Sequence, residues 1–316
     1  MRKRALGKTG LFVSEMGIGT WGLSGEAYGP VDPADAERVL HRAIDVGMTL
    51  IDTADSYGGG KMERLLGKAL APYKNKDLVV VTKGGTDRST VPARKRFDRP
   101  YLVDSVERSL KRLGRERLDV YLLHNPSLDC LVAGDAFEVM ATLKREGKIG
   151  HYGISAGESE TAMAALDRGA EVISMPYNLL HSVDVHRVAG EIMVSGAGVL
   201  VHSTLAYGLL SDLWSRDRAF AEGDHRAKRW EKHELARRID QLDALRFLVK
   251  GNVRSLRAAA IRFALANHLV SCAILGPRTA DQLVELVRET GGGPVYLPDA
   301  DLAALPRTLA KVGILM

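Results

Sequence analysis

Residues 50–60 read LIDTADSYGGG. A short apolar strand ends there at the carboxylate of Asp52, and a glycine-rich turn after Tyr57 leads into a helical run from Lys61 to Leu70. An α/β fold presents its chemistry where strands end on charged residues and continue into flexible loops, at the carboxyl edge of the sheet. Asp52 and Tyr57 are therefore the first candidate site residues.

The same order of strand and helix recurs along the chain. Strands are expected where short apolar runs occur, at residues 16–19, 50–52, 78–82, 120–123, 152–155, 172–175, 198–203 and 269–275. Helices are expected between and after them, at residues 32–46, 62–70, 100–113, 135–145, 158–167, 185–195, 255–267 and 280–289. Strands buried on both faces and alternating with helices indicate a parallel sheet. Eight such units predict an α/β fold of the (β/α)8 TIM-barrel type.

Three segments lie outside this order. Residues 1–15 are expected to form an N-terminal β-hairpin with a glycine-containing turn. Residues 209–251 are long and strongly charged, which is typical of a lid or specificity element on the C-terminal face of a barrel. Residues 291–294 predict a flexible link to a last helix at 299–312, which would pack outside the barrel or over its mouth.

Length and composition are those of a globular enzyme. Of the 316 residues, 46% are hydrophobic and 26% are charged, and no repeat or change of composition marks a boundary. We therefore predict one domain over residues 1–316. An open dinucleotide-binding sheet is the alternative, but the spaced glycines of residues 17–22, GIGTWG, are a weak signal. The number of units favours the barrel.

The net charge of +5 does not by itself indicate an anionic partner. Basic residues are scattered along the predicted helices, with concentrations at residues 94–99 and 226–232 that we interpret as solvated helix faces and loops. No nucleic-acid-binding motif occurs, so no nucleic-acid partner is expected.

Membrane, metal and disulfide functions are not expected either. No run of 18 apolar residues is present. Cys130 and Cys272 lie far apart without metal-type spacing or a secretory signal, so both are expected to be free thiols in a reducing, cytoplasmic setting.

Titratable residues follow three successive predicted strands. Asp52, Lys83 and His124 stand at the strand ends, and Tyr57 lies in the loop after Asp52. Each residue alone has a structural explanation, such as capping a turn or placing an ammonium at the surface. In a barrel, however, these strand ends converge at one face, which predicts a common site.

Here the sequence resembles a known family. Residues 52–58 (DTADSYG), Thr82-Lys83 and residues 122–126 (LLHNP) resemble the catalytic motifs of the aldo-keto reductases. The resemblance covers nearly the whole chain, from RALGKTG at residues 4–10 to LGPRT at residues 275–279. It implies a nicotinamide-dependent oxidoreductase that reduces a small-molecule aldehyde or ketone to an alcohol.

The chemistry of the four residues agrees with this resemblance. Tyr57 would be the general acid in reduction and the base in oxidation, but an ordinary tyrosine pKa of ~10 makes it a poor catalyst near neutrality. Lys83 is expected to lower that pKa, and Asp52 to hold Lys83 in place. His124, expected to be neutral, would orient the substrate oxygen.

The resemblance also implies ligand contacts. Cofactor contacts are expected at Thr20, Trp21, Asp52, Ser155, Ser174, His202, Ser203, Leu205, Gly208, Gly276, Arg278, Gln282 and Glu285. Substrate contacts are expected at Trp21, Tyr28 and Asn125. Arg278, just before a helix N-terminus, can neutralise a 2′-phosphate, so NADPH is favoured over NADH as the cofactor.

Some residues depart from the family pattern. Ala156 and Ser174 stand where many members have side-chain amides, and Leu286 stands where an asparagine is frequent. His202 replaces an aromatic residue that stacks on the nicotinamide in many members. These departures weaken the expected hold on the cofactor without changing the predicted fold.

Two other functions stay open at this point. The chain could be a nucleotide-binding sensor or scaffold subunit, similar to the potassium-channel β-subunits that retain the same four residues. Lys83 could instead form a Schiff base in a barrel lyase, although the neighbouring Asp52 favours a charged lysine. Trp214 and Trp230 either line the pocket or anchor the insertion. The sequence leaves self-association and the substrate undetermined.

Overall fold

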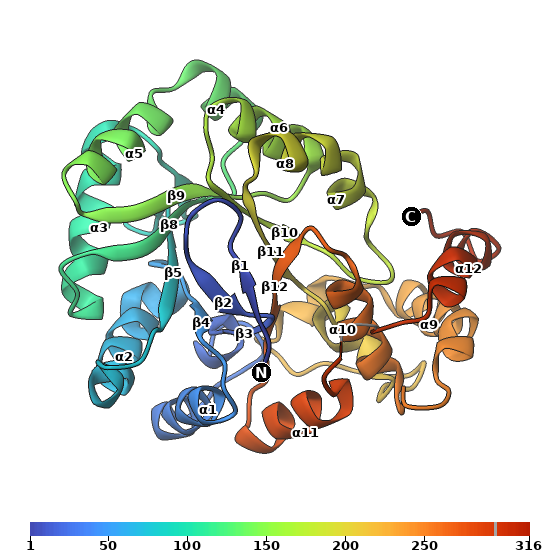
Figure 1. Cartoon of the computed structure of the whole chain (residues 1–316). Coiled ribbons are helices and arrows are strands. Elements are labelled where there is room, and N and C mark those ends of the chain that lie inside the picture. Colours follow the sequence, from blue (N-terminus) through green and yellow to red (C-terminus); the bar gives the residue numbers. More distant parts are fainter. Residues whose placement is uncertain (294–295) are drawn as a thin grey trace.

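Eight parallel strands close into a barrel, in the order β10-β11-β12-β3-β4-β5-β8-β9. The fold is that of a computed structural model, which describes residues 1–293 and 296–316. All eight predicted strands are present, and helices surround them (Figure 1). Their bounds are β3 Met16–Gly19, β4 Leu50–Asp52, β5 Val79–Gly84, β8 Leu118–His124, β9 Ile149–Ser155, β10 Val172–Pro176, β11 Gly198–His202 and β12 Val270–Leu275. The (β/α)8 prediction is confirmed.

The surrounding helices begin at capping residues that the sequence supplies. Asp32 accepts a hydrogen bond from the Ala34 N–H at 2.7 Å ahead of α1, and Thr279 accepts one from the Gln282 N–H at 3.1 Å ahead of α11. The helices of the outer layer are α1 Pro33–Asp45, α2 Lys61–Leu70, α3 Arg99–Leu113, α5 Ala136–Arg145, α6 Ser159–Asp167, α7 Val183–Arg187, α8 Ala189–Ser195, α10 Leu256–Ala266 and α11 Ala280–Thr290.

One predicted helix is divided. The apolar pattern predicted a single helix over residues 185–195, but α7 ends and α8 begins around Val188. Val188 has a ψ of 6° and a fully buried side chain. The helical geometry is therefore interrupted at a buried side chain, which a one-dimensional apolar pattern does not reveal.

The barrel interior is filled by alternate residues of the strands. Leu50, Val81, Leu122, Val172 and Leu200 belong to one buried cluster inside the barrel, because successive side chains of a strand point to opposite faces. The hairpin formed by β1 (Lys3–Ala5) and β2 (Phe12–Ser14) contributes Leu6 and Val13 to this same cluster. Figure 1 shows the hairpin in front of the barrel strands, where it closes the amino-terminal end.

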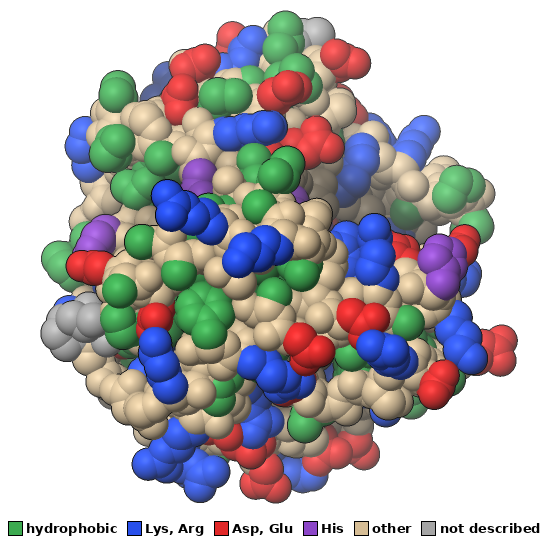
Figure 2. Space-filling model, turned by 90° about the vertical axis from the view of Figure 1, so that its right-hand side faces the viewer, with side chains coloured by type: hydrophobic (Ala, Val, Ile, Leu, Met, Phe, Trp, Pro, Cys, Tyr) green, Lys and Arg blue, Asp and Glu red, His purple; other side chains and the backbone are tan. Residues whose placement is uncertain are grey.

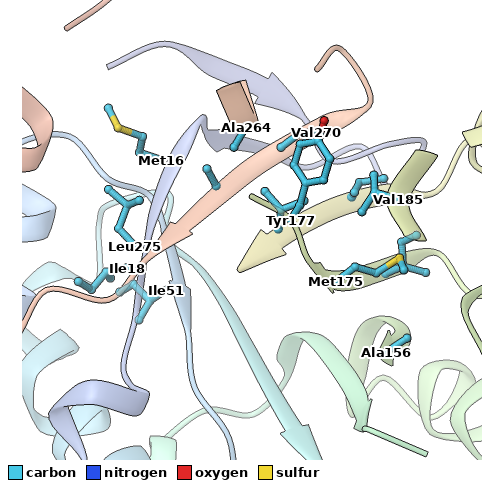
Figure 3. Packing of buried hydrophobic residues seen from close by; sticks show 14 of the residues in the cluster. Met16, Ile18, Ile51, Ala156, Met175, Tyr177, Val185, Ala264, Val270 and Leu275 are labelled. Carbon is cyan, nitrogen blue, oxygen red and sulfur yellow. The ribbon is translucent and has the colours of Figure 1, made fainter. Parts of the chain in front are cut away.

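The other side chains of each strand pack outward against the helices. Figure 3 shows part of this layer, in which Ile18, Ile51 and Leu275 from three neighbouring strands lie together. All three are 0–1% exposed. Burial of such side chains contributes roughly 1.5–3 kcal/mol each relative to exposure. The two-layer arrangement therefore explains why the strands are continuous apolar runs.

Additional elements lie at the ends of the barrel strands. The insertion, residues 209–251, folds into short helices rather than an extended loop: it begins within η4 Ala206–Ser211 and continues through η5 His225–Lys228, α9 Lys232–Leu242 and η6 Asp243–Leu248. The last helix, α12 Asp299–Ala310, packs against η6, outside the barrel strands (Figure 1). The predicted flexible link at 291–294 includes Pro294, which lies outside the described residues.

Several short elements were not predicted. They are η1 Trp21–Leu23, η2 Tyr57–Gly60, η3 Ala71–Tyr73, the hairpin of β6 Thr86–Asp87 and β7 Arg94–Lys95, and α4 Leu128–Ala133. A strand of two residues carries no readable alternation, so the β6–β7 hairpin has no signature of its own. It nevertheless lies beside the candidate active site.

The distribution of surface charge and the state of the two cysteines can be compared with the sequence analysis. Side chains of both charges are interspersed on the face shown in Figure 2. Cys130 and Cys272 are not joined by a disulfide. Within the described residues, no helix combines the length and the apolarity that crossing a membrane needs.

Candidate active site

The alternation that fills the barrel interior also builds the site. In each of these strands, the residue two positions after the interior apolar residue faces the same way and stands at the carboxyl end of the strand. We call the face of the barrel formed by these carboxyl ends the mouth. These positions are Asp52, Lys83, His124, Ser174 and His202. Polar residues thus replace apolar ones at one layer of the barrel, which brings together the strand-end residues that the sequence predicted.

Asp52 and Lys83 form a buried ion pair at the mouth. Lys83 Nζ donates a hydrogen bond to the Asp52 carboxylate and another to the main-chain oxygen of Thr53 at 3.1 Å. Burial raises the pKa of Asp52, and the charge of Lys83 opposes that shift. The pair agrees with the prediction that Asp52 holds Lys83 in place.

Tyr57 is presented by a tight turn next to this pair. Gly58 and Gly59 follow it with φ angles of 60°, a conformation that favours glycine. The Tyr57 ring centroid lies 5.8 Å from Lys83 Nζ and 5.9 Å from the centroid of the His124 ring. The three side chains therefore meet around one point of the mouth.

The expected lowering of the Tyr57 pKa is not observed. Burial, followed by the nearby Asp52 carboxylate, raises the pKa of Tyr57 well above its ordinary range. The charge of Lys83 is balanced by Asp52, while burial disfavours the phenolate. Tyr57 is thus held as the protonated phenol, which is the form that can donate a proton.

His124 is held as a neutral imidazole. Burial, followed by the charges of Lys83 and Lys95, lowers its pKa well below the ordinary value. Ser56 Oγ lies 3.4 Å from His124 Nδ1, and the main-chain oxygen of His124 accepts a hydrogen bond from Lys95 Nζ at 2.6 Å. The neutral state agrees with the prediction.

The neighbouring strand ends carry polar groups that suit a nicotinamide: the Thr20 N–H donates to the main-chain oxygen of Asp52 at 2.9 Å, and Ser155 is the strand partner of His124. Thr20 Oγ1 and Ser174 Oγ are buried without a hydrogen-bond partner in the described part of the chain. Ser155 ends β9 as a buried residue. Such groups suit a carboxamide, because buried polar atoms otherwise lack hydrogen bonds.

The loop after β11 has an unusual backbone. Ser203, Ala206 and Tyr207 have φ angles of 56°, 47° and 60°, and Gly208 follows with 100°. The Ala206 N–H donates to the main-chain oxygen of Ser203 at 2.8 Å, and the Gly208 N–H donates to that of Leu205 at 2.9 Å, so these amides hold the turn of the loop itself. Leu205, predicted as a cofactor contact, lies within this loop, half-buried. The contact of this loop with a pyrophosphate stays a prediction.

His202 stands beside this loop. Its Nδ1 lies 3.1 Å from Ser203 Oγ, and burial, followed by the charge of Lys83, lowers the pKa of His202 to about 3. The ring is therefore neutral, so the pH-dependent charge expected from replacing an aromatic residue with histidine is suppressed.

The turn between β12 and α11 differs in part from the prediction. Arg278 Nη2 donates to the main-chain oxygens of Gly29 and Pro30 at 3.1 and 3.0 Å, so its guanidinium also fastens the loop after β3. Gln282 Oε1 accepts from the Arg278 N–H at 2.9 Å, beyond Gly276.

Two further residues of α11 are engaged by the fold itself. Glu285 forms an ion pair with Arg257 at 2.5 Å, and its carboxylate keeps further acceptor capacity, so its predicted cofactor contact stays a prediction. Leu286, which replaces the asparagine frequent in the family, is buried in the hydrophobic layer between the strands and the helices. Both side chains stabilise the packing of α11 against its neighbours.

Aromatic side chains gather over the mouth. The His225 ring lies 4.7 Å from Trp21 and 4.8 Å from Tyr28, centroid to centroid. The main-chain N–H of His225 donates to the main-chain oxygen of Ala27 at 2.9 Å, which joins the insertion to the loop after β3. Trp21 and Tyr28, both predicted as substrate contacts, thus lie together, with ring centroids 5.4 Å apart. Sequence reasoning missed His225, although the basic run at 226–232 adjoins it.

Of the remaining predicted residues, Asn125 lies near the mouth, whereas Trp214 and Trp230 pack within the insertion. Asn125 follows His124 with a φ of 50° and donates its N–H to the Ser155 oxygen at 2.9 Å, which places it at the rim of the mouth. Trp214 and Trp230 lie 5.9 Å apart, centroid to centroid, and pack on the main core. The two tryptophans therefore act as anchors of the insertion.

Comparisons with known proteins identify the family of the chain. The model of the Aldo/keto reductase family matches residues 15–290. Aldo-keto reductase YhdN of Bacillus subtilis (strain 168) is 32% identical over 304 residues, which cover 92% of this chain and 89% of that protein. NADH-specific methylglyoxal reductase of Escherichia coli (strain K12) is 28% identical, over 98% of this chain and 99% of that protein.

A solved structure leads to the same family. The glycerol dehydrogenase AKR11B4 from Gluconobacter oxydans superimposes with a TM-score of 0.85 at 27% identity, covering 98% of this chain and 96% of that one. Sequence and structural similarity thus extend over nearly the whole chain. The chain belongs to the aldo/keto reductase family, whose members act on small carbonyl compounds, and is an NAD(P)H-dependent oxidoreductase.

Proposed function

We propose that this protein reduces an aldehyde or ketone to the alcohol with NADPH, using Tyr57 as the general acid. The observation that carries the proposal is the meeting of Tyr57, the Asp52–Lys83 ion pair and neutral His124 at one point of the mouth. A bound nicotinamide supplies the hydride for this reaction. The protein's own task is to hold the carbonyl and to deliver a proton.

Proton delivery follows from the local charges. Tyr57 donates its phenolic proton to the carbonyl oxygen as negative charge develops there. Lys83 stabilises the phenolate that is left, and Asp52 keeps the ammonium in position. In the alcohol-to-carbonyl direction, the same phenolate accepts the proton.

His124 orients the substrate oxygen. When Ser56 Oγ donates to Nδ1, the proton of the neutral ring is on Nε2, which is then a hydrogen-bond donor to the carbonyl oxygen. A neutral imidazole polarises the carbonyl without competing with Tyr57 as the acid. Asn125, Trp21 and Tyr28 would surround the rest of the substrate.

NADPH is preferred over NADH in this proposal because of Arg278. It precedes the N-terminus of α11, where main-chain N–H groups add to an anion site. Only Nη2 of its guanidinium is hydrogen-bonded in the described residues, to the loop after β3. Membership of the family does not decide the preference, since the Escherichia coli relative is described as NADH-specific. We further propose that residues 1–316 act as one domain.

A titration tests the proposal most directly. Purified protein would be titrated with NADPH and NADH by cofactor fluorescence, and turnover followed by cofactor absorbance on a panel of reactive aldehydes. We expect tighter binding of NADPH together with turnover. Binding of neither nucleotide would contradict the proposal.

Two other results would favour other functions. Tight nucleotide binding without turnover on a broad carbonyl panel would favour a nucleotide-binding sensor or scaffold subunit. Borohydride trapping of a carbonyl compound on Lys83 without nucleotide would favour a Schiff-base lyase.

A further inference from the structure

The β6–β7 hairpin covers one side of the mouth and is fastened there. Arg88, in the turn of the hairpin, donates to the main-chain oxygen of Ser56 at 2.6 Å and to Glu26 at 2.8 Å. Lys95, in β7, donates to the main-chain oxygen of His124 at 2.6 Å. The hairpin is thus joined to the loops that carry Tyr57 and His124.

The other basic residues of this hairpin have carboxylate partners. Arg88 pairs with Glu26, and Arg94 pairs with Asp87 at 3.2 Å. Arg96 pairs with Asp98 at 2.9 Å. These arginines fold and fasten the hairpin, and their charges are neutralised locally.

Lys95 differs from these arginines. Its Nζ donates to two neutral oxygens, those of His124 and of Thr86 Oγ1 at 2.9 Å, and an ammonium has a third donor. No carboxylate lies within ion-pair distance of Lys95 in the described part of the chain. Asp55, whose charge acts on Lys95 from farther away, already accepts a hydrogen bond from Ser105. A positive charge without a counterion is therefore held in place beside His124.

We propose that Lys95 is a specificity residue that binds an anionic group, a carboxylate or a phosphate, on a short aldehyde or ketone substrate. The inference rests on the proposed function, because it places the carbonyl at Tyr57 and His124. Lys95 contacts the main chain of His124, whose ring faces the carbonyl in this proposal. The anionic group and the carbonyl are therefore expected to be only a few bonds apart in the substrate. The two neutral acceptors hold the ammonium in advance, which reduces the entropy lost on binding.

Paired substrates test this proposal. Succinic semialdehyde is compared with butanal for a carboxylate, and glyceraldehyde 3-phosphate with glyceraldehyde for a phosphate. In wild-type protein we expect a higher kcat/KM for the anionic member of at least one pair, and that pair identifies the anion. Lys95→Met should lower this value about tenfold or more, mainly through KM, and leave the neutral member within about twofold.

Two further variants separate charge from folding. Lys95→Arg should keep the preference for the anionic substrate, since it keeps the cation. Arg94→Met, which removes the neighbouring cation that Asp87 neutralises, should leave the preference unchanged. Equal losses on charged and neutral substrates in Lys95→Met would show that Lys95 only holds the hairpin on β8. No preference in wild-type protein would equally overturn the proposal.

A binding measurement tests the anion site without turnover. Inorganic phosphate and succinate are titrated calorimetrically into wild-type protein and into the Lys95→Met variant. Binding that weakens about tenfold in the variant would support the anion site even if no aldehyde were reduced, so failure of the proposed function would be seen separately. Equal binding to both proteins, or binding to neither, would overturn the role of Lys95.

Discussion

Asp52 and Lys83 form an ion pair at the mouth with only 8% and 3% of their side-chain surfaces exposed. Asp52 ends β4, and Lys83 lies two residues beyond its register partner Val81 in β5. Because β4 and β5 are neighbours and both side chains face the interior, closure of the barrel itself brings the two charges together. The same ion pair therefore serves the chemistry at Tyr57 and the stability of the barrel.

Removing one member of this pair should destabilise the protein. Lys83→Met leaves the Asp52 carboxylate buried without its partner, which costs about 3–5 kcal/mol of unfolding free energy. The double variant Lys83→Met/Asp52→Leu should lose much less than the sum of the two single variants. Denaturant unfolding measures all three. Strictly additive losses would contradict the pairing.

Tyr57→Phe should separate proton transfer from binding. The ring and its packing beside His124 are kept, and only the phenolic proton is lost. We expect kcat to fall about a hundredfold to ten-thousandfold, with the Kd of NADPH nearly unchanged. Steady-state kinetics and a fluorescence titration measure the two quantities. Full activity of this variant would exclude Tyr57 as the general acid.

Asp55 should make stability depend on pH. Burial raises its pKa from an ordinary 3.8 to about 6, and Ser105 Oγ donates to its carboxylate at 2.9 Å. Because the folded pKa lies above the unfolded value, the folded state binds the proton more tightly. Stability is therefore lost as the pH rises from about 4 to about 6, by up to roughly 3 kcal/mol.

The variant Asp55→Asn isolates this contribution. The asparagine side chain cannot ionise, so the unfolding free energy of the variant should fall less steeply as the pH rises from about 4 to about 6. Asp167→Asn, at an exposed carboxylate, should keep the wild-type slope. Denaturant unfolding at a series of pH values gives the slopes, and an unchanged slope in Asp55→Asn would refute the assignment.

Arg278→Ala should affect both the cofactor preference and a loop. We expect the Kd of NADPH to rise about tenfold more than that of NADH, because only NADPH carries the 2′-phosphate. Loss of the hydrogen bonds to Gly29 and Pro30 should also make the loop after β3 more susceptible to proteolysis. Arg288→Ala, which removes an exposed charge from the same helix, is the control. Equal losses of affinity for NADPH and NADH would show that Arg278 only holds the loop after β3 and does not bind the 2′-phosphate.

Gly84 should tolerate no side chain. A Cβ there would lie 1.9 Å from the Tyr121 hydroxyl and 2.5 Å from Ser105 Oγ. Both groups belong to the hydrogen-bonded chain that ends at Asp55, so Gly84→Ala should destabilise the protein by about 3 kcal/mol or more. Gly157→Ala, where no atom lies within 4 Å, is the matched control. Similar thermal unfolding of both variants would contradict this packing.

The sequence by itself determined the barrel and its polar strand ends. Strands enclosed on both faces must be apolar, so their runs are visible without a structure. A closed parallel barrel brings all carboxyl ends to one face, so Asp52, Lys83 and His124 could be grouped from their positions alone. The hairpin at residues 1–15 was visible from its turn.

Only the tertiary structure decided the charges and partners at the mouth. Whether the pKa of Tyr57 rises or falls depends on how far burial outweighs the charge of Lys83, which no local pattern records. The Arg278 side chain donates a hydrogen bond to Gly29, which lies 249 residues away in the sequence. Lys95, which the sequence analysis interpreted as solvated, donates one to His124, which lies 29 residues away. Such contacts arise from chain closure in three dimensions, whereas periodicity reports only which face of an element is buried.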